Sequence, residues 1–212
     1  YTISEQSNSG TDDRRNKPMF TKGQNTLAQI KHSEKIFDDF KRENLLPNKL
    51  SQLGPGISWG DIDNDNDNDV YIGGASGYPG RIFVNNGNSE FIMKYQPSFL
   101  GDKNFEDMGV LFIDVDEDGD LDLFVASGGV ECVPGSSLLL DRIYLNDGLG
   151  NFTKDRSSLM PDIRTSSSVV TAADIDLDGT QEIFIGGRVV PGEYPSSPSS
   201  YIIKKIDSNY SD

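Results

Sequence analysis

Apolar and polar positions follow the same order in three parts of this chain. In each part a short apolar segment precedes nine residues rich in Asp and Asn, and a second apolar segment comes after them. The second segments are Val70-Tyr71-Ile72, Leu123-Phe124-Val125 and Ile183-Phe184-Ile185. Because β-branched and aromatic residues favour strands, the pattern predicts a strand, an acidic loop and a second strand. The first strands of the three parts are expected at residues 56–60, 109–113 and 169–173.

A further shared segment follows each acidic loop after a stretch of variable length. The three segments, residues 82–91, 143–152 and 201–210, align without a gap. Asn86-Gly87 and Asp147-Gly148 are hairpin signals in the first two. Each repeat therefore reads as strand, acidic loop, strand, variable loop, strand, turn and strand. Four antiparallel strands in repeats of 53 to 60 residues are typical of β-propeller blades, so we expect an all-β chain with about three blades.

The repeat pattern divides the chain into expected units. The blades are predicted at residues 50–108, 109–168 and 169–212, after a linker or preceding segment at 1–49. Within that segment, residues 26–46 carry apolar side chains at roughly helical spacing, which predicts a helix. These side chains are Leu27, Ile30, Phe37 and Phe40.

The acidic loops place a carboxylate at positions 1, 3, 5 and 9 in all three copies. Alternate residues can turn their oxygens toward one point, and position 7 can add a backbone carbonyl. Position 6 is Asn66, Gly119 or Gly179, residue types that accept a left-handed backbone. The candidate metal-binding residues are Asp61, Asp63, Asp65, Asp67 and Asp69, then Asp114, Asp116, Asp118, Asp120 and Asp122, and finally Asp174, Asp176, Asp178, Thr180 and Glu182. Such an oxygen cage suits Ca²⁺, and three calcium ions are expected.

An EF-hand and a metal-free acidic turn are two other interpretations of the acidic loops. An EF-hand has a bidentate Glu at position 12 and flanking helices, whereas position 12 here is Ile72, Val125 or Ile185 within a predicted strand. A solvated acidic turn without metal is the plainer alternative. Three copies in one register favour the metal site, because this many like charges at close range repel one another without a cation.

The repeats resemble the FG-GAP/VCBS family, the calcium-loop propeller blades that also occur in the heads of integrin α-chains. The residues that carry the resemblance are Gly60 to Asp65, Gly119 to Leu123 and Arg142 to Gly148. The sequences of these segments are similar to those of bacterial secreted VCBS proteins, including those with an ASPIC/UnbV tail. Asn66 and the run Thr180-Gln181-Glu182 depart from the usual pattern. The family's closed propellers have about seven blades, so the resemblance implies further blades outside this chain.

Charge and composition narrow the partners. The chain has a net charge of −15, which argues against nucleic acid or an anionic membrane as partner. No apolar stretch is long enough to predict a membrane span. Calcium loops of low affinity need the millimolar calcium found outside cells, so an extracellular or cell-surface location is expected. The resemblance to secreted proteins points to a bacterial outer surface.

Strand alternation separates the acidic loops from the variable loops. Acidic loops join first and second strands, and so lie at one end of every blade, while the loops at 75–80, 130–141 and 188–200 lie at the other. Variable loops on a rigid scaffold are a common means of binding partners, here a protein or a glycan in adhesion. The expected exposed contact residues are Tyr78, Arg81, Glu131, Arg188, Glu193 and Tyr194. For each of them taken singly, a plain solvated loop residue is the favoured interpretation.

An enzyme is the competing function. Some polysaccharide lyases resemble this architecture, and the chain could be a catalytic or non-catalytic part of a secreted polysaccharide-degrading enzyme. The sequence has a single His, His32, and a single Cys, Cys132, with no nucleophile–base pair. We therefore expect this chain not to be an enzyme.

Overall fold

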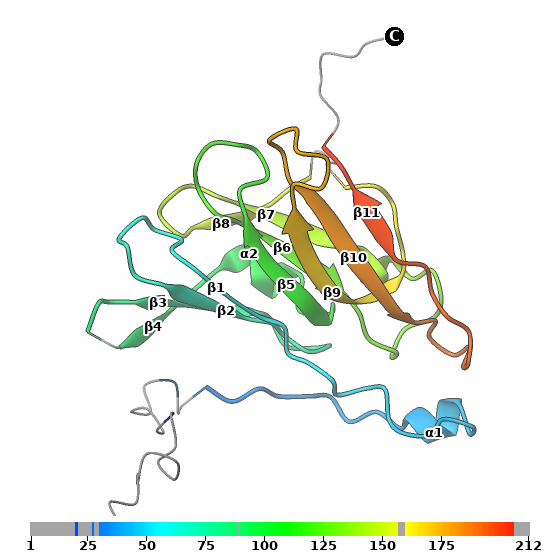
Figure 1. Ribbon diagram of the computed structural model, residues 1–212. Coiled ribbons are helices and arrows are strands. Elements are labelled where there is room, and N and C mark those ends of the chain that lie inside the picture. The colour runs from blue at the N-terminus through cyan, green and yellow to red at the C-terminus, as the bar shows by residue number, and fades with distance from the viewer. Residues whose placement is uncertain (1–19, 21–26, 28–29, 89, 157–159, 206–212) are drawn as a thin grey trace, which may run out of the picture.

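The computed structural model describes residues 20, 27, 30–88, 90–156 and 160–205. These residues form three antiparallel sheets that lie side by side (Figure 1). The first sheet has the strands β1 (Ile57–Gly60), β2 (Asp69–Ile72), β3 (Arg81–Asn85) and β4 (Phe91–Lys94). The second has β5 (Asp107–Ile113), β6 (Asp122–Ser127), β7 (Arg142–Asn146) and β8 (Phe152–Lys154). The third has β9 (Ser166–Ala173), β10 (Glu182–Val189) and β11 (Tyr201–Ile203).

Helix is scarce in the described residues. It is limited to α1 (Asp39–Arg42), α2 (Pro97–Gly101) and a 3-10 turn at Ser137–Leu139. None is long and apolar enough to cross a membrane. The expected all-β chain of four-stranded antiparallel sheets, of the kind found in propeller blades, is confirmed. The fourth strand expected in the last repeat lies outside the described residues, and the blade limits at 50–108, 109–168 and 169–212 stay a prediction, as does the linker at 1–49.

Two expectations about local structure are wrong. The helical spacing in residues 26–46 produces only the four residues of α1, and residues 30–38 are extended or irregular. In the last repeat, the gapless alignment is off by one position: Ile72, Val125 and Ile185 pair with Arg81, Arg142 and Tyr201. Strand pairing follows backbone register, which the diverged side chains of the third copy do not reveal.

The core lies between the sheets because β6 is apolar on both faces. Leu123 and Val125 face the first sheet and pack with Tyr71 and Ile82. Alternate residues of β6 face the third sheet, where Phe124 packs with Ile183 and Ile185. Burying a large apolar side chain stabilises a fold by about 1.5–3 kcal/mol, so these two clusters hold the three sheets together.

A buried polar network joins the first two sheets. Arg142 donates to the Oδ1 atom of Asp107 at 2.6 Å, and Tyr71 donates to its Oδ2 atom at 2.7 Å. Arg142 also donates to the hydroxyl of Tyr144, which donates to Asp102. Because Asp107 and Arg142 are both buried, each charge depends on the other for solvation.

The two outer sheet faces of this three-sheet stack are apolar and partly open, although Leu27 and Ile30 cover Val70 and Phe83 on the first sheet. Phe184 and Ile202 are 37% and 59% exposed on the third sheet, and Val169 is exposed beside them. On the first sheet, Trp59 and Met93 are 51% and 55% exposed. Open apolar faces on both sides are typical of sheets that other layers cover.

Residues 30–56 form an extended segment, here called the N-terminal strap, that crosses one end of the sheets. In Figure 1 it runs below them, while the loops between first and second strands lie at the opposite end. Its backbone accepts hydrogen bonds from Arg81, at Lys31, and from Arg188, at Leu50. The buried Asp39 carboxylate organises the strap itself by accepting from the backbone N–H groups of Leu50 and Ser51.

Candidate metal centres

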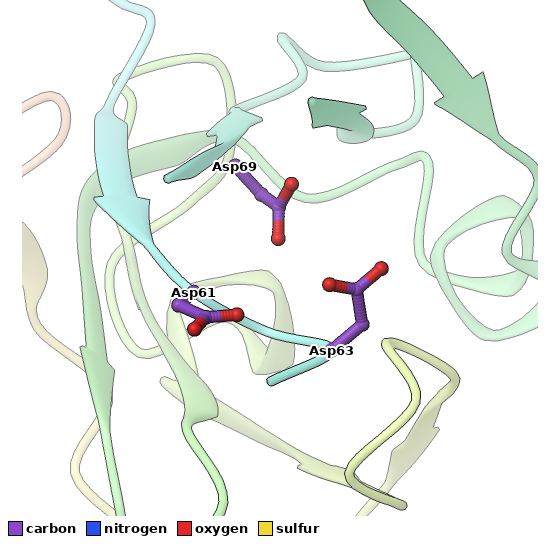
Figure 2. A group of neighbouring side chains, drawn as sticks. All are labelled: Asp61, Asp63 and Asp69. Carbon is purple, nitrogen blue, oxygen red and sulfur yellow. The ribbon is translucent and has the colours of Figure 1, made fainter. Parts of the chain in front are cut away.

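Three groups of carboxylates converge at the end of the sheets opposite the strap. They are Asp61, Asp63 and Asp69, then Asp114, Asp116 and Asp122, and finally Asp174, Asp176 and Glu182. In each group one oxygen from every residue lies within 4.8 Å of the others. The three side chains of the first group point toward one another, Asp61 and Asp63 from the loop between β1 and β2 and Asp69 from the start of β2 (Figure 2). These are positions 1, 3 and 9 of the acidic loops.

Backbone N–H groups fix the first position of every loop. Asp61 accepts from Asp65 and Asn66, which closes the loop into a tight turn. Asp114 and Asp174 make the same kind of contact with the N–H groups of their own loops. The carboxylate at position 1 is thereby oriented whether or not an ion is bound.

The ninth position connects the loop to the following strands. Asp69 accepts from the N–H of Ile62 at 3.1 Å and from the N–H of Asn85 at 2.7 Å. Asp122 accepts in the same way from Val115 and Asn146. Both carboxylates are fully buried at the start of their strands. The acid at position 9 therefore ties the metal group to the sheet.

Positions 5 and 7 of the acidic loops lie outside the three converging groups, and their role as ligands stays a prediction. The side chains at position 5, Asp65, Asp118 and Asp178, are not in the converging groups, and each accepts from the N–H two residues later. That N–H belongs to the position-7 residue, which is Asp67, Asp120 or Thr180. The Oδ1 atom of Asp120 accepts from the side chain of Asn64 at 2.8 Å, which links the first loop to the second.

The backbone of the loops is left-handed at two places. Position 6 has positive φ in all three copies, as the sequence predicts, with Asn66 at 70° and Gly119 and Gly179 at 94° and 96°. Position 4 is also left-handed, at Asn64, Glu117 and Leu177. Of these three, only Asn64 is a residue type that accepts this conformation readily, because Glu and Leu rarely adopt it. Glu117 and Leu177 carry strain of order 1 kcal/mol each in this conformation. Contacts from outside these residues must therefore stabilise the loop.

The electrostatics of the first two groups favour a bound cation. Burial, with the charges of Asp65 and Asp61, raises the pKa of Asp63, and its Oδ1 atom is buried without a hydrogen bond. Burial is also the main cause that raises the pKa of Asp122 to about 6, with the charges of Asp116 and Asp118 adding to it. Since a nearby cation would reverse both effects, these groups fit a metal ion.

The donor set indicates which kind of ion fits. The converging atoms are all carboxylate oxygens, and neither His nor Cys joins the groups. Oxygen-only sites suit hard cations such as Ca²⁺ and Mg²⁺ better than zinc or copper. The three groups could hold metal ions, and the residues present are compatible with calcium.

The third group differs because a lysine reaches it. The ammonium of Lys204 lies 2.6 Å from the Oδ2 atom of Asp178 and 3.4 Å from the Oε1 atom of Glu182, and it also contacts Asp176. Hydrogen bonds to Asp176 and Asp178 raise the pKa of Lys204, and the same lysine lowers the pKa of Asp178. Sequence reasoning missed this residue, because the alignment that was off by one position hid its place at the end of β11.

The expected partner-binding residues lie at the strap end, where several touch the strap. Arg81 and Arg188 donate to strap carbonyls, at 2.8 and 3.0 Å. Glu131 lies 3.5 Å from the ammonium of Lys35, and its side chain is 11% exposed. The expectation that these three are exposed is wrong, because the strap packs against the strand ends that carry Arg81 and Arg188 and against the loop that carries Glu131. Arg188 is therefore expected to affect stability, unlike a free surface residue.

The other three candidates are exposed. Tyr78 is 45% exposed and lines a hollow of about 130 Å³ beside Lys31 and His32. Tyr194 is 44% exposed, and its backbone N–H donates to Glu43 of the strap at 2.7 Å. Glu193 is exposed next to it. Tyr78, Glu193 and Tyr194 thus remain on the surface beside the strap.

A comparison with known protein families supports the repeat pattern seen in the sequence. Residues 61–125 match the model of the FG-GAP-like repeat, from the first residue of the first acidic loop to the end of the second loop and into β6. The resemblance seen in the sequence is confirmed for this family, whereas the bacterial VCBS and ASPIC type stays a prediction. No curated protein matches the chain.

Proposed function

We propose that this chain is a calcium-binding FG-GAP propeller module that acts by binding and not by catalysis. The observation that carries the proposal is the convergence of the acids at positions 1, 3 and 9 in every loop, with ligand oxygens within 4.8 Å of one another. Calcium takes 6–8 oxygen ligands and tolerates irregular geometry, so loop carbonyls and water would complete the shell. Mg²⁺ demands a stricter octahedron and suits these crowded carboxylates less well.

The role of calcium in this proposal is structural. The loops connect β1 to β2, β5 to β6 and β9 to β10, so an ion there would fix the start of each second strand. Asp69 and Asp122 already connect the ion site to the hairpin residues Asn85 and Asn146. Binding of an ion to the folded state alone stabilises that state by mass action.

Calcium binding is tested by measuring the number of ions per chain. Equilibrium dialysis against calcium, after extraction with EDTA, is expected to give bound calcium with a matching rise in melting temperature. Magnesium at the same concentration is the control and is expected to give a smaller rise. A chain that binds no calcium, or that responds equally to both ions, would contradict the proposal.

The binding surface in this proposal lies at the strap end. Exposed tyrosines combine an apolar ring with a polar tip, which suits both protein and glycan ligands, and Tyr78 and Tyr194 lie among the variable loops. A double variant, Tyr78→Ala with Tyr194→Ala, is expected to reduce binding to an array of polysaccharides and matrix proteins without lowering the melting temperature. Leu149→Ala changes an exposed side chain at the metal end and serves as the control.

The module is further proposed to work outside the cell and beside other blades. Millimolar extracellular calcium would saturate loops of this type, and this supports a secreted or cell-surface location on a bacterium. The open apolar faces around Phe184 and Trp59 support additional blades on both sides, as in a larger propeller. Nucleic acid is an unsuitable partner for a chain with a net charge of −15.

Binding without catalysis is supported by the placement of the reactive residues. The single histidine, His32, lies 2.5 Å from Glu34 within the strap. Burial raises the pKa of Cys132, which disfavours the nucleophilic thiolate. Neither residue is placed as a nucleophile–base pair would require.

A further inference from the structure

The third acidic loop contains a positive charge supplied by the protein. Lys204 follows β11 directly, and its ammonium approaches three acids of the loop, Asp176, Asp178 and Glu182. Two of them, Asp176 and Glu182, are among the three residues that converge as a candidate metal group. The lysine nitrogen therefore lies against the carboxylates that a metal ion would need.

The first two loops have no lysine at the structural position of Lys204, although Lys94 acts on Asp63 of the first loop from a distance, without an ion pair. Pairing of Ile183 with Ile203 places Lys204 at the register of Val84 in the first sheet and Leu145 in the second. Both of those residues are apolar. Among the residues that the structure describes, no lysine or arginine forms an ion pair with the converging acids of the first or second loop. The lysine is thus a difference between repeats at one structural position.

The third loop is also the least acidic of the three. It has four acids in its nine residues, against five in the first loop and six in the second. Its seventh residue is Thr180, where the others have Asp, and its hydroxyl donates to Asp178 at 2.5 Å. The Oε1 atom of Glu182 is buried and accepts no hydrogen bond, while the equivalent oxygens of Asp69 and Asp122 accept from Asn85 and Asn146. An ammonium at 3.4 Å is its nearest compensation.

An ammonium and a calcium ion compete for the same oxygens. An ammonium has three donors and no acceptor, so it satisfies carboxylates but cannot join a metal's ligand shell. Calcium could bind there only after breaking the charge-assisted contacts of Lys204, which are among the stronger polar contacts in proteins. The first two loops impose no such cost.

We propose that Lys204 is a built-in cation of the third loop, so that the chain takes calcium tightly at two loops and holds the third together without it. This inference rests on the calcium binding proposed above. It replaces the expectation of three equivalent ions by two strong sites and one that the lysine occupies.

The decisive experiment counts calcium ions in variants of this lysine. Native mass spectrometry and dialysis at a free calcium concentration that saturates the tight sites are expected to give two ions for the wild type. Lys204→Met keeps the length of the side chain and removes its charge, and is expected to bind three. The affinity of the third site for calcium should rise at least about tenfold, because calcium no longer has to break a polar contact of Lys204 in order to bind. Lys204→Arg keeps the charge and is expected to remain at two.

Lys205 offers a matched control and melting curves a second readout. Lys205 pairs with Glu117 at 2.8 Å, outside the converging groups, so Lys205→Met should leave two ions. In EDTA, Lys204→Met should melt at a lower temperature than the wild type, because the acids of the third loop have lost the ammonium of Lys204. Addition of calcium should restore the melting temperature of the variant. Lys204→Gln repeats the measurement if the Met variant folds poorly.

Each other outcome overturns the inference in a recognisable way. Three tight ions in the wild type mean that Lys204 does not hold the site. Two ions in Lys204→Met and Lys204→Gln alike mean that the loop lacks a calcium cage with or without the lysine. No calcium in any variant would remove the proposed calcium function itself along with the inference.

Discussion

The two ends of the sheets solve the problem of buried acids in opposite ways. At the strap end, the carboxylate of Asp107 is paired with Arg142, and Asp39 accepts N–H groups of its own strap. At the metal end, Asp63 has a buried oxygen without a hydrogen bond, and Asp122 is buried near other acids. Asp107 and Asp39 are compensated within the chain, whereas the acids of the metal end carry an excess of negative charge that an external cation would neutralise. The comparison teaches that acidity alone does not mark a metal site; converging carboxylates with an unpaired buried oxygen do.

Removal of calcium is the largest expected effect and should act on the metal end alone. At a hundredfold excess over Kd, each occupied site contributes about 2.7 kcal/mol to the free energy of unfolding, so two tight sites contribute roughly 5 kcal/mol. EDTA should therefore lower the melting temperature strongly, as followed by circular dichroism. A melting curve that is the same in EDTA and in calcium would show that the metal end does not depend on an external cation, and would contradict the comparison.

Arg142→Met should damage the strap end to a similar extent and without regard to calcium. The variant leaves the buried Asp107 without its partner, and loss of one member of a buried pair costs about 3–5 kcal/mol. Denaturation in urea should give the same loss in calcium and in EDTA. Arg164→Met breaks an exposed pair with Asp162 and is the control, with little change expected. A loss that depends on calcium would show that the two ends are coupled.

The effect of Asp122→Asn on stability should depend on calcium. In calcium the variant should lose one ion and roughly 2–3 kcal/mol of stability, the contribution of one site. In EDTA at pH 7 the loss should be much smaller or change sign, because an amide removes a buried carboxylate whose pKa is raised to about 6 by burial, which offsets the loss of one of the two hydrogen bonds that Asp122 accepts from backbone N–H groups. Urea denaturation in both conditions measures the difference. Equal destabilisation in both would assign Asp122 a role independent of metal.

Glu106 tests whether the strap end has a weak point of its own. Burial, then the charges of Glu34 and Glu131, raises its pKa to about 7 from an ordinary value of 4.5. The folded state therefore holds this proton more tightly than the unfolded state, and the stability it gives below pH 4.5 is lost as the pH rises to 7. Glu106→Gln should gain on the order of 1–3 kcal/mol over the wild type at pH 8, and little at pH 5.

The control for Glu106 is an exposed acid of the same end. Glu193→Gln changes a solvated residue and should leave the difference between pH 5 and pH 8 unaltered. Taking each variant against the wild type at the same pH removes the contribution of the acidic loops. If Glu106→Gln has no advantage at pH 8, Glu106 is not held in an unfavourable charged state.

Local patterns in the sequence were enough for the strands and the metal loops. The strand segment Leu123-Phe124-Val125 was recognisable because β6 is apolar on both faces. Its neighbour β7 was recognisable because it leads into the hairpin signal Asp147-Gly148. Positions 1, 3 and 9 were recognisable because ligand spacing within nine residues is set by the backbone of one loop. The left-handed residue at position 6 followed from Gly or Asn. These features need no information from distant parts of the chain.

The tertiary structure decided what each charged residue meets. Arg81 and Arg188 look like free surface residues in the sequence, yet they bind the strap, 50 and 138 positions away. Lys204 is one of two adjacent lysines, and only the pairing of β10 with β11 directs it into the third loop while Lys205 goes to Glu117. The physical reason is that ligand spacing is a property of a single loop, whereas charge compensation depends on through-space distances between segments that only folding brings together.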